Sequence, residues 1–285
     1  VYRALNEYAQ ALADYNSAIE LVSDAAGYYQ RRAYLYMEIE EYLQAITDLN
    51  TAIELDPEDA DSYYARGMSR GDLGEYDTAL ADFTEAIELN PGYANAFLKR
   101  ADMYYQLEQY ENALTDYGQA IALNPDNSTA YNNRANVLRI QEEFELSIPD
   151  YSKAIELEPD EVLHYYGRAY SYMGLKQYVQ AISDWNKVLS FQPNNDNVFY
   201  QKALALDPRN AYASNNIGWI YHDRKTYDKA ITYFKQSILA DTRLISAYNG
   251  LSKTFFENGQ FDSARIYYSK AFANYQDKSI VNVYI

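Results

Sequence analysis

The sequence contains no cysteine, which excludes disulfide-linked scaffolds, thiolate metal sites and cysteine nucleophiles. Its seven prolines and 11 glycines are few for 285 residues and favour long helices over a turn-rich β fold. No stretch approaches the roughly 18 uninterrupted apolar residues that a membrane span needs. Because a chain without cysteine fits reducing and oxidising compartments alike, we expect a soluble protein of the cytoplasm or, if an export signal was removed, of the periplasm or extracellular space.

Histidine is almost as scarce as cysteine. The two histidines, His164 and His222, belong to neither a catalytic triad nor a metal-ligand motif. The sequence has no P-loop and no glycine-rich dinucleotide motif, and the acidic run 56–61 lacks the loop glycine and terminal glutamate of an EF-hand. We therefore predict a protein that is not an enzyme and that holds no metal and no cofactor.

Positive charge is also in short supply, with 24 Lys and Arg against 41 Asp and Glu and a net charge of −17. Such a chain is unsuited to nucleic acid, because binding to phosphates requires a basic surface. The charge is uneven, since residues 211–285 carry a net +3 and the first 210 residues a net −20. Self-association through this acidic body and basic end is one possible function.

What the sequence does have is an internal period of 34 residues. The same step separates five prolines, the aromatic residues that begin a helical stretch, and two sets of small residues further along that stretch. The prolines are Pro57, Pro91, Pro125, Pro159 and Pro193, each preceded by a phrase related to AIELDP. Each unit reads as two helices, for example 60–73 and 76–89, separated by a turn at Gly74 and closed by a proline. Because neither helix can bury its apolar stripe alone, neighbouring units must stack.

These features resemble the tetratricopeptide repeat. The resemblance rests on the 34-residue step, on a glycine or alanine in the first helix (Gly67, Ala101), and on the A-x3-[FY]-x2-A pattern of Ala79, Phe83 and Ala86. It implies an all-α fold, a right-handed α-solenoid of stacked antiparallel helix hairpins. One solenoid is predicted over 1–285, with full repeats at 26–59, 60–93, 94–127, 128–161, 162–195, 211–244 and 245–278, a partial repeat at 1–25 and a short tail at 279–285.

The period breaks at residues 196–210. This segment reads as the end of a second helix, with Ala203 and Pro208 in their usual places, but its first helix is missing. Either a helix was deleted, or about 19 residues are absent near residue 196, and we favour the second explanation.

Arginine and aspartate change together between repeats. Five first helices carry an arginine, and the aspartate of the same repeat follows 16 residues later: Arg32 with Asp48, Arg66 with Asp82, Arg100 with Asp116, Arg134 with Asp150, and Arg168 with Asp184. In the last two repeats both change, to Ile217 with Tyr233 and to Leu251 with Tyr267. Joint replacement predicts that the two positions touch, as ion pairs between the helices of a hairpin.

The resemblance also implies where a ligand would bind. In the family the first helices line a concave groove, and positions two, five, nine and twelve of each unit face it. Carried over, these positions give the candidate partner-binding residues Tyr34, Tyr64, Met68, Tyr105, Asn132, Asn136, Arg139, Tyr166, Tyr170, Met173, Asn215, Trp219 and His222. The Lys, Asn and Arg set with which one subtype binds chaperone tails is incomplete, so we do not predict that activity.

The predicted function is therefore a non-catalytic scaffold that binds a partner peptide or helix in the concave groove. One alternative is binding of a glycan or small ligand on aromatic platforms such as Tyr166, Tyr170 and Trp219. Others are a self-assembling structural module and one arm of a larger protein.

Overall fold

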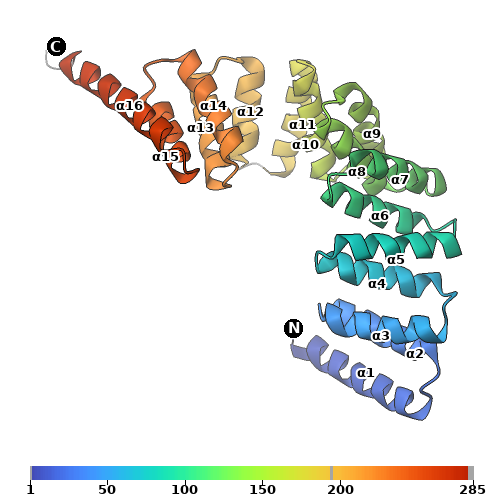
Figure 1. Ribbon diagram of the computed structural model, residues 1–285. Helices are drawn as coiled ribbons and strands as arrows, with labels where there is room; N and C mark the ends of the chain where they lie inside the picture. The colour runs from blue at the N-terminus through green and yellow to red at the C-terminus, as the bar shows by residue number, and fades with distance from the viewer. Residues whose placement is uncertain (1, 193–194, 282–285) are drawn as a thin grey trace. The chain divides into compact units, whose positions relative to one another are not determined.

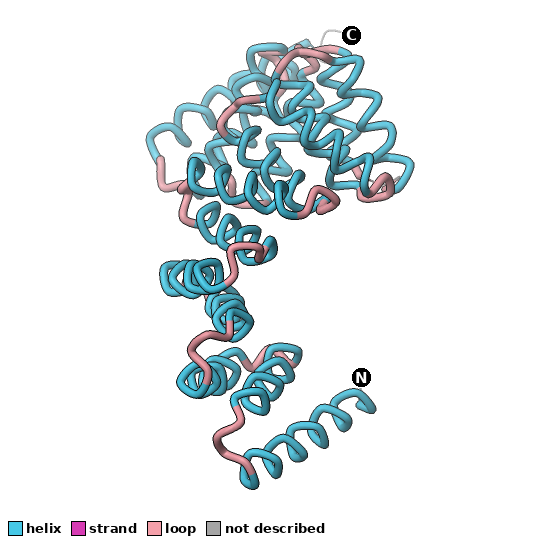
Figure 2. The backbone as a smooth tube through the Cα atoms, turned by 90° about the vertical axis from the view of Figure 1, so that its right-hand side faces the viewer, coloured by secondary structure: helices cyan, strands magenta, loops and turns pink. Residues whose placement is uncertain are grey.

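The computed structural model describes residues 2–192 and 195–281, and within these ranges the chain is helical, with no β-strand (Figures 1 and 2). Short loops join successive helices throughout the described ranges (Figure 2). The chain divides into two compact units, residues 1–160 and residues 161–285, which are described one at a time. We call the two helices of each hairpin its first and second helix.

Unit 1 contains one leading helix and four hairpins. Its helices are α1 (Tyr2–Leu21), α2 (Ala26–Glu38), α3 (Tyr42–Leu55), α4 (Ala60–Asp72), α5 (Tyr76–Leu89), α6 (Ala94–Gln106), α7 (Tyr110–Leu123), α8 (Ser128–Ile140) and α9 (Phe144–Leu157). The hairpins are α2–α3, α4–α5, α6–α7 and α8–α9, and each packs against the next. The helices at 60–72 and 76–89 confirm the predicted pair at 60–73 and 76–89.

Unit 2 contains three hairpins and one single helix. Its helices are α10 (Val162–Gly174), α11 (Tyr178–Phe191), α12 (Asp196–Leu206), α13 (Ala211–Asp223), α14 (Tyr227–Ala240), α15 (Ile245–Glu257) and α16 (Phe261–Val281). The hairpins are α10–α11, α13–α14 and α15–α16. The last helix ends at Val281, three residues into the predicted tail of 279–285.

The local signals that start and stop these helices act as expected. The acidic run before α4 is a turn, in which the Asp59 side chain accepts hydrogen bonds from the backbone N–H groups of Asp61 and Ser62 and caps the helix. The turn inside each hairpin needs one residue in the left-handed region. Gly74 supplies it with a φ of 78°, while Glu108 adopts a φ of 57° at the equivalent place.

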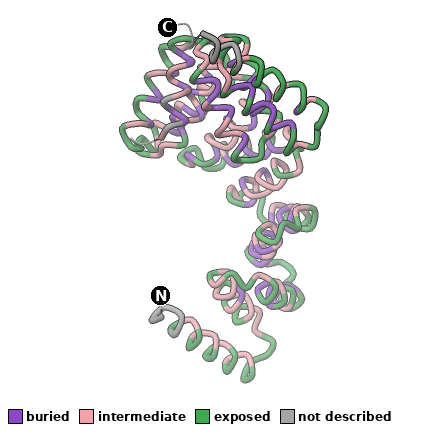
Figure 3. Tube along the Cα trace, turned by 90° about the vertical axis from the view of Figure 1, so that its left-hand side faces the viewer, coloured by how far each residue is buried: buried purple, intermediate pink, exposed green. Residues whose placement is uncertain are grey.

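Small residues lie where the helices cross, as the period predicted. Ala45, Ala79, Ala113 and Ala181 are fully buried, so the backbones of the two helices can approach closely. Four residues further along, in every second helix except α16, a large side chain packs between the helices and is at most 2% exposed. These side chains are Leu49, Phe83, Tyr117, Tyr151, Trp185 and Phe234. Buried residues follow the packed sides of the helices, and the loops are mostly exposed (Figure 3).

The break in the period is occupied by the single helix α12, which packs against both α11 and α13. Toward α11 it lies in the register of a first helix, because Lys202 Nζ donates to Asn186 Oδ1 at 2.7 Å, as Arg66 does to Asn50 in unit 1. Toward α13 it acts as a second helix, with Leu204 packed in one cluster with Ala213 and Ile217. The segment is thus more than the end of a second helix, since one helix takes both roles. The predicted gap near residue 196 adjoins residues 193–194, which lie outside the described ranges, and stays a prediction.

Candidate functional site

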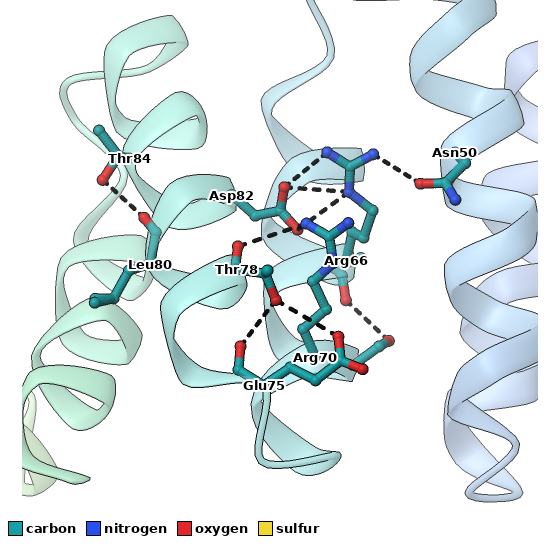
Figure 4. Close-up of polar contacts among 10 residues, drawn as sticks. Asn50, Arg66, Arg70, Glu75, Thr78, Leu80, Asp82 and Thr84 are labelled. Carbon is teal, nitrogen blue, oxygen red and sulfur yellow. Dashed lines mark hydrogen bonds and ion pairs between the residues drawn. The ribbon is translucent and has the colours of Figure 1, made fainter. Parts of the chain in front are cut away.

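The predicted arginine–aspartate pairs clasp the hairpins of unit 1 and the first hairpin of unit 2. In each pair the guanidinium binds the carboxylate through Nε and a terminal nitrogen, as Arg100 does at 2.6 and 2.9 Å from the Asp116 oxygens. The carboxylates are buried, with side-chain exposures of 4–10%. Around Asp82, both Arg66 and Arg70 reach the same carboxylate, each at 2.7 Å (Figure 4). The inference from joint replacement is confirmed.

Some of these arginines also tie one hairpin to the preceding helix. Arg32 donates to Asn16 Oδ1 in α1 at 2.6 Å, and Arg66 donates to Asn50 Oδ1 in α3 at 2.8 Å. Arg100 donates in the same way to Thr84 in α5 at 3.0 Å. The hydrogen bonds that Arg100 donates to the paired Asp116 raise the pKa of Arg100, so the guanidinium stays charged. These arginine and aspartate side chains therefore hold the hairpins together.

A groove of about 420 Å³ opens in unit 1 over three successive first helices, α4, α6 and α8. Three candidate residues line it: Met68 from α4, Tyr105 from α6 and Asn136 from α8. Its other lining residues include Asp72, Lys99, Asp102, Met103, Gln106, Tyr117 and Asn133. The groove thus combines apolar side chains, amides and charged groups in one continuous space.

Asp102 is the polar centre of this groove, and its side chain is 22% exposed. Its Oδ1 accepts hydrogen bonds from the Tyr117 hydroxyl at 2.8 Å and from Asn133 Nδ2 at 3.1 Å. Its Oδ2 lies 3.4 Å from Lys99 Nζ, which is one helical turn away on α6. Burial, and then the negative charge of Asp102, raises the pKa of Tyr117, so this hydroxyl remains a donor at physiological pH.

The next hairpin repeats the arrangement with a neutral acceptor. Asn136 Oδ1 accepts from the Tyr151 hydroxyl at 2.8 Å, and Arg139 Nε donates to the same hydroxyl at 3.2 Å. Asn132 donates to Asn133 Oδ1 at 3.3 Å. These candidate residues are half-buried and form a polar strip along α8.

The two remaining candidates of unit 1 form an aromatic group with Tyr93. The Tyr64 and Tyr93 rings lie 4.9 Å apart, and the Tyr93 hydroxyl donates to Asp61 Oδ1 at 2.6 Å. Tyr34 is 39% exposed, and burial, followed by the charges of Asp61 and Asp59, raises its pKa to about 12. This group does not line the groove that contains Met68, Tyr105 and Asn136.

In unit 2, two candidate tyrosines of α10 are held by one amide. The Tyr166 and Tyr170 hydroxyls lie 3.3 Å apart, and Asn197 of α12 donates to both of them. The Tyr170 ring stands edge-on to Trp185, with centroids 6.1 Å apart. Met173, one turn further along α10, is half-buried. Much of this tyrosine surface is therefore used for packing within unit 2.

The candidates on α13 differ sharply in exposure. Trp219 lines a mostly apolar cavity of about 640 Å³ together with Lys253, Phe256, Phe261 and Tyr268. Asn215 and His222 are buried, with exposures of 5% and 3%. His222 Nδ1 lies 3.0 Å from the Thr254 hydroxyl, whose hydrogen is given to Gly250 O at 2.7 Å, so Nδ1 is the donor. This bond joins α13 to α15 beneath the cavity.

The sequence reasoning missed Lys99, Asp102, Tyr117 and Asn133 as groove residues. A second pairing between repeat positions could have revealed Asp102 and Tyr117, because position nine of a repeat contacts the residue 15 further along, in the second helix. A polar residue there pairs with tyrosine (Asp102 with Tyr117, Asn136 with Tyr151), whereas Trp219 meets Phe234 edge-on with centroids 5.3 Å apart.

Across the described residues, no group of three or more His, Asp or Glu side chains is placed to hold a metal ion. No helix within the described ranges is both long and apolar enough to cross a membrane.

Solved structures with the same fold are repeat proteins. YrrB, described as a TPR protein with an unusual peptide-binding site, is 22% identical, with a TM-score of 0.59 over 67% of this chain and 98% of that one. A tetratricopeptide repeat protein from Parabacteroides merdae is 16% identical, with a TM-score of 0.59 over 90% of this chain and 96% of that one. MamA from Desulfovibrio magneticus is 20% identical, with a TM-score of 0.56 over 60% of this chain and 97% of that one. A comparison with curated protein sequences found no match.

Sequence models of the repeat itself match most of the chain. Those described as TPR repeat match residues 33–70 and 101–139, and those described as tetratricopeptide repeat match 60–93, 128–161, 199–232 and 245–277. The chain therefore belongs to the tetratricopeptide repeat family, whose repeats serve in general as non-catalytic protein-interaction modules.

Proposed function

We propose that this chain is a scaffold that holds an extended segment of a partner protein along the first-helix face of unit 1. The observation that carries the proposal is the groove of about 420 Å³ over α4, α6 and α8. Packed neighbouring helices lie about 8–10 Å apart, so three of them span about 20 Å. About six residues of extended chain, at roughly 3.3 Å each, would cover that length.

The chemistry of the groove suits a peptide. Met68, Met103 and Tyr105 offer apolar surface to side chains, and thioethers adapt to varied shapes. Asn133 and Asn136 bring amides to the same space, and amides can pair with the N–H and C=O groups that an extended backbone leaves unpaired. The similar fold of YrrB, described as having an unusual peptide-binding site, supports a peptide as the ligand class.

A peptide-binding experiment tests the proposal. Peptides selected from a random display library on the full chain would be labelled, and their dissociation constants measured by fluorescence anisotropy. The groove variant Met68→Ala/Tyr105→Ala should weaken binding by about tenfold or more, as expected for truncated contact residues. The matched control is Leu43→Ala/Leu146→Ala, which removes two apolar side chains of second helices that are 65% and 61% exposed.

The outcomes separate the alternatives. Loss of binding in the groove variant, with helicity kept by circular dichroism and the control unaffected, supports the proposal. Equal affinity of the wild type and the groove variant would contradict it and move the interface off this face. If no peptide is selected at all, the proposal fails, and sedimentation of the chain at low and high salt would then test self-association.

A second candidate function is binding of a glycan or small polar ligand in unit 2. It is favoured by the arrangement of Tyr166, Tyr170 and Asn197, which places two rings and an amide together. A glycan array probed with the wild type and with Tyr166→Ala/Tyr170→Ala tests it. Binding that is absent from the wild type, or that survives in the variant, would rule out this site.

A further inference from the structure

The groove of unit 1 lies in a strongly acidic part of the chain. Residues 1–160 contain 31 Asp and Glu and 10 Lys and Arg, a net charge of −21, whereas residues 161–285 carry a net +4. Half of the basic residues of unit 1 are bound to buried aspartates in the clasps: Arg32, Arg66, Arg70, Arg100 and Arg134. A surface of one sign attracts ligands of the opposite sign and speeds their association. The electrostatic environment of the groove therefore favours a basic ligand.

The negative charge of Asp102 is not needed for folding. At the equivalent place of the next hairpin, Asn136 accepts the Tyr151 hydroxyl at 2.8 Å, the distance at which Asp102 accepts Tyr117. A neutral carbonyl oxygen thus makes the structural hydrogen bond equally well. What the carboxylate adds is a full charge and a second oxygen, Oδ2, both of which face the groove space that Asp102 lines.

Lys99, the partner of Asp102 on the same helix, is held weakly enough for a cationic ligand to displace it from the carboxylate. Lys99 Nζ lies 3.4 Å from Oδ2, its side chain is 34% exposed, and the pair spans three residues of one helix. Ion pairs between residues three apart on one helix contribute little to stability. A guanidinium or ammonium arriving in the groove could take Oδ2, while its aliphatic stem lies on Met68 and Met103 and Asp72 adds negative charge to the lining.

We infer that the groove of unit 1 selects a partner segment carrying a lysine or arginine, whose cationic head pairs with Asp102. The inference rests on the proposed function, because it names the chemistry of the segment that this same groove would hold. It predicts selectivity by charge, which a purely apolar or amide-lined groove would not have.

The test uses four pools of twelve-residue peptides, random except at two central positions that are fixed as Lys, Arg, Gln or Glu. Retention of each pool by the immobilised full chain is measured at low and at high salt. We expect the Lys and Arg pools to be retained about threefold to tenfold better than the Gln pool, with the advantage reduced at high salt. Asp102→Asn should remove most of that advantage, so that the variant retains the Lys and Arg pools little better than the Gln pool.

Two further variants complement Asp102→Asn: one adds a carboxylate to the groove, and the other is a control outside it. Asn136→Asp, which places a second carboxylate one hairpin along, should increase retention of the basic pools. Glu85→Gln removes a charge from an exposed residue of α5 that is not among those lining the groove, and should leave the preference as it is. Circular dichroism of each variant confirms that the helices are intact.

Failure of the inference differs from failure of the proposed function. If the Gln or Glu pool is retained as well as the basic pools, the charge preference is wrong although the groove still binds peptides. If the preference for basic pools survives Asp102→Asn, the cation binds elsewhere and the inference is overturned. If the wild type retains none of the four pools, both the inference and the peptide-scaffold proposal fail.

Discussion

Hairpin α6–α7 of unit 1 and hairpin α13–α14 of unit 2 join their two helices by different kinds of contact. In hairpin α6–α7, Arg100 and the buried carboxylate of Asp116 join the two helices by paired hydrogen bonds. In hairpin α13–α14 the same two positions are Ile217 and Tyr233, which pack in one apolar cluster. There the Tyr233 ring stacks on Tyr221 with centroids 5.4 Å apart and an angle of 13° between the ring planes. Hairpin α15–α16 does the same with Phe255 and Tyr267, 5.6 Å apart.

The comparison separates what the fold requires from how it is met. The repeat requires a complementary contact between its position seven, in the first helix, and its position 23, in the second helix. A bidentate ion pair makes this contact with a fixed geometry, because the planar guanidinium pairs with a carboxylate in only a few orientations. Stacked rings make the contact through complementary shape and buried apolar area, and they bury no charge that a partner would have to compensate. Removing one partner of an ion pair should therefore strongly destabilise a hairpin of the charged kind. A hairpin of the aromatic kind should be destabilised most by an added atom that overpacks its rings.

The largest effect is expected where two arginines share one carboxylate. Asp82→Ala would leave Arg66 and Arg70, which are 16% and 22% exposed, without their buried partner. Loss of one partner of a buried ion pair costs about 3–5 kcal/mol. We expect the free energy of unfolding to fall by that amount in urea denaturation, with the fastest hydrogen exchange in α4 and α5.

The control for this variant is Glu85→Ala, which removes an exposed carboxylate from the same helix and should change stability by less than about 0.5 kcal/mol. Equal effects of the two substitutions would show that the clasp contributes no more than a surface charge does.

Much of the fold can be predicted from the sequence because the same residue pattern recurs in each repeat. Helix bounds, the capping turn before α4 and the crossing alanines follow from a proline, a glycine or an alanine at a fixed step. The contact between Arg66 and Asp82 is readable because both positions change together elsewhere in the chain. The double role of α12 is not, since it depends on Lys202 and Leu204 facing different neighbours, which a repeat alignment treats as one register.

The groove is only partly readable, for a physical reason. Position nine points to the first-helix face, which correctly singles out Met68 and Asn136 as lining residues. Whether such a residue is accessible depends on its neighbours. His222, chosen at position twelve by the same family pattern, is buried, and its Nδ1 donates to Thr254 of the next first helix. Asp102 also occupies position nine but was not chosen as a candidate. Its place at the centre of the groove depends on contacts with Tyr117 of the second helix and Asn133 of the next hairpin.

An intermediate effect is expected from glycines that fit against a ring. A Cβ added at Gly218 would lie 2.8 Å from Phe234, and one added at Gly250 would lie within 2.5 Å of Cζ of the same ring. Gly250→Ala should therefore destabilise the aromatic hairpins by about 1–3 kcal/mol through overpacking. In the charged hairpins, a Cβ added at Gly118 would make an ordinary contact, 3.8 Å from Nη1 of Arg134. Gly118→Ala should raise stability by up to about 1 kcal/mol through helix propensity, so thermal denaturation should show shifts of opposite sign. Stabilisation by both substitutions would mean that the Phe234 ring moves freely and that shape does not limit this joint.

The smallest net effect is expected from converting one kind of hairpin into the other. Hairpin α6–α7 already carries Tyr104 at the position of Tyr221, so Arg100→Ile/Asp116→Tyr would rebuild the trio of Ile217, Tyr221 and Tyr233 around it. Replacing a buried ion pair by apolar groups that fill the space is often neutral or stabilising, so the double variant should stay within about 1 kcal/mol of the wild type. Asp116→Ala alone should lower the free energy of unfolding by about 3–5 kcal/mol, because Arg100 is then buried without its partner.

A double-mutant cycle over Arg100→Ile, Asp116→Tyr and their combination measures the coupling between the two positions. If the two single effects simply add in the double variant, the positions are independent, and the joint replacement of arginine and aspartate in the last two hairpins has a cause other than their contact.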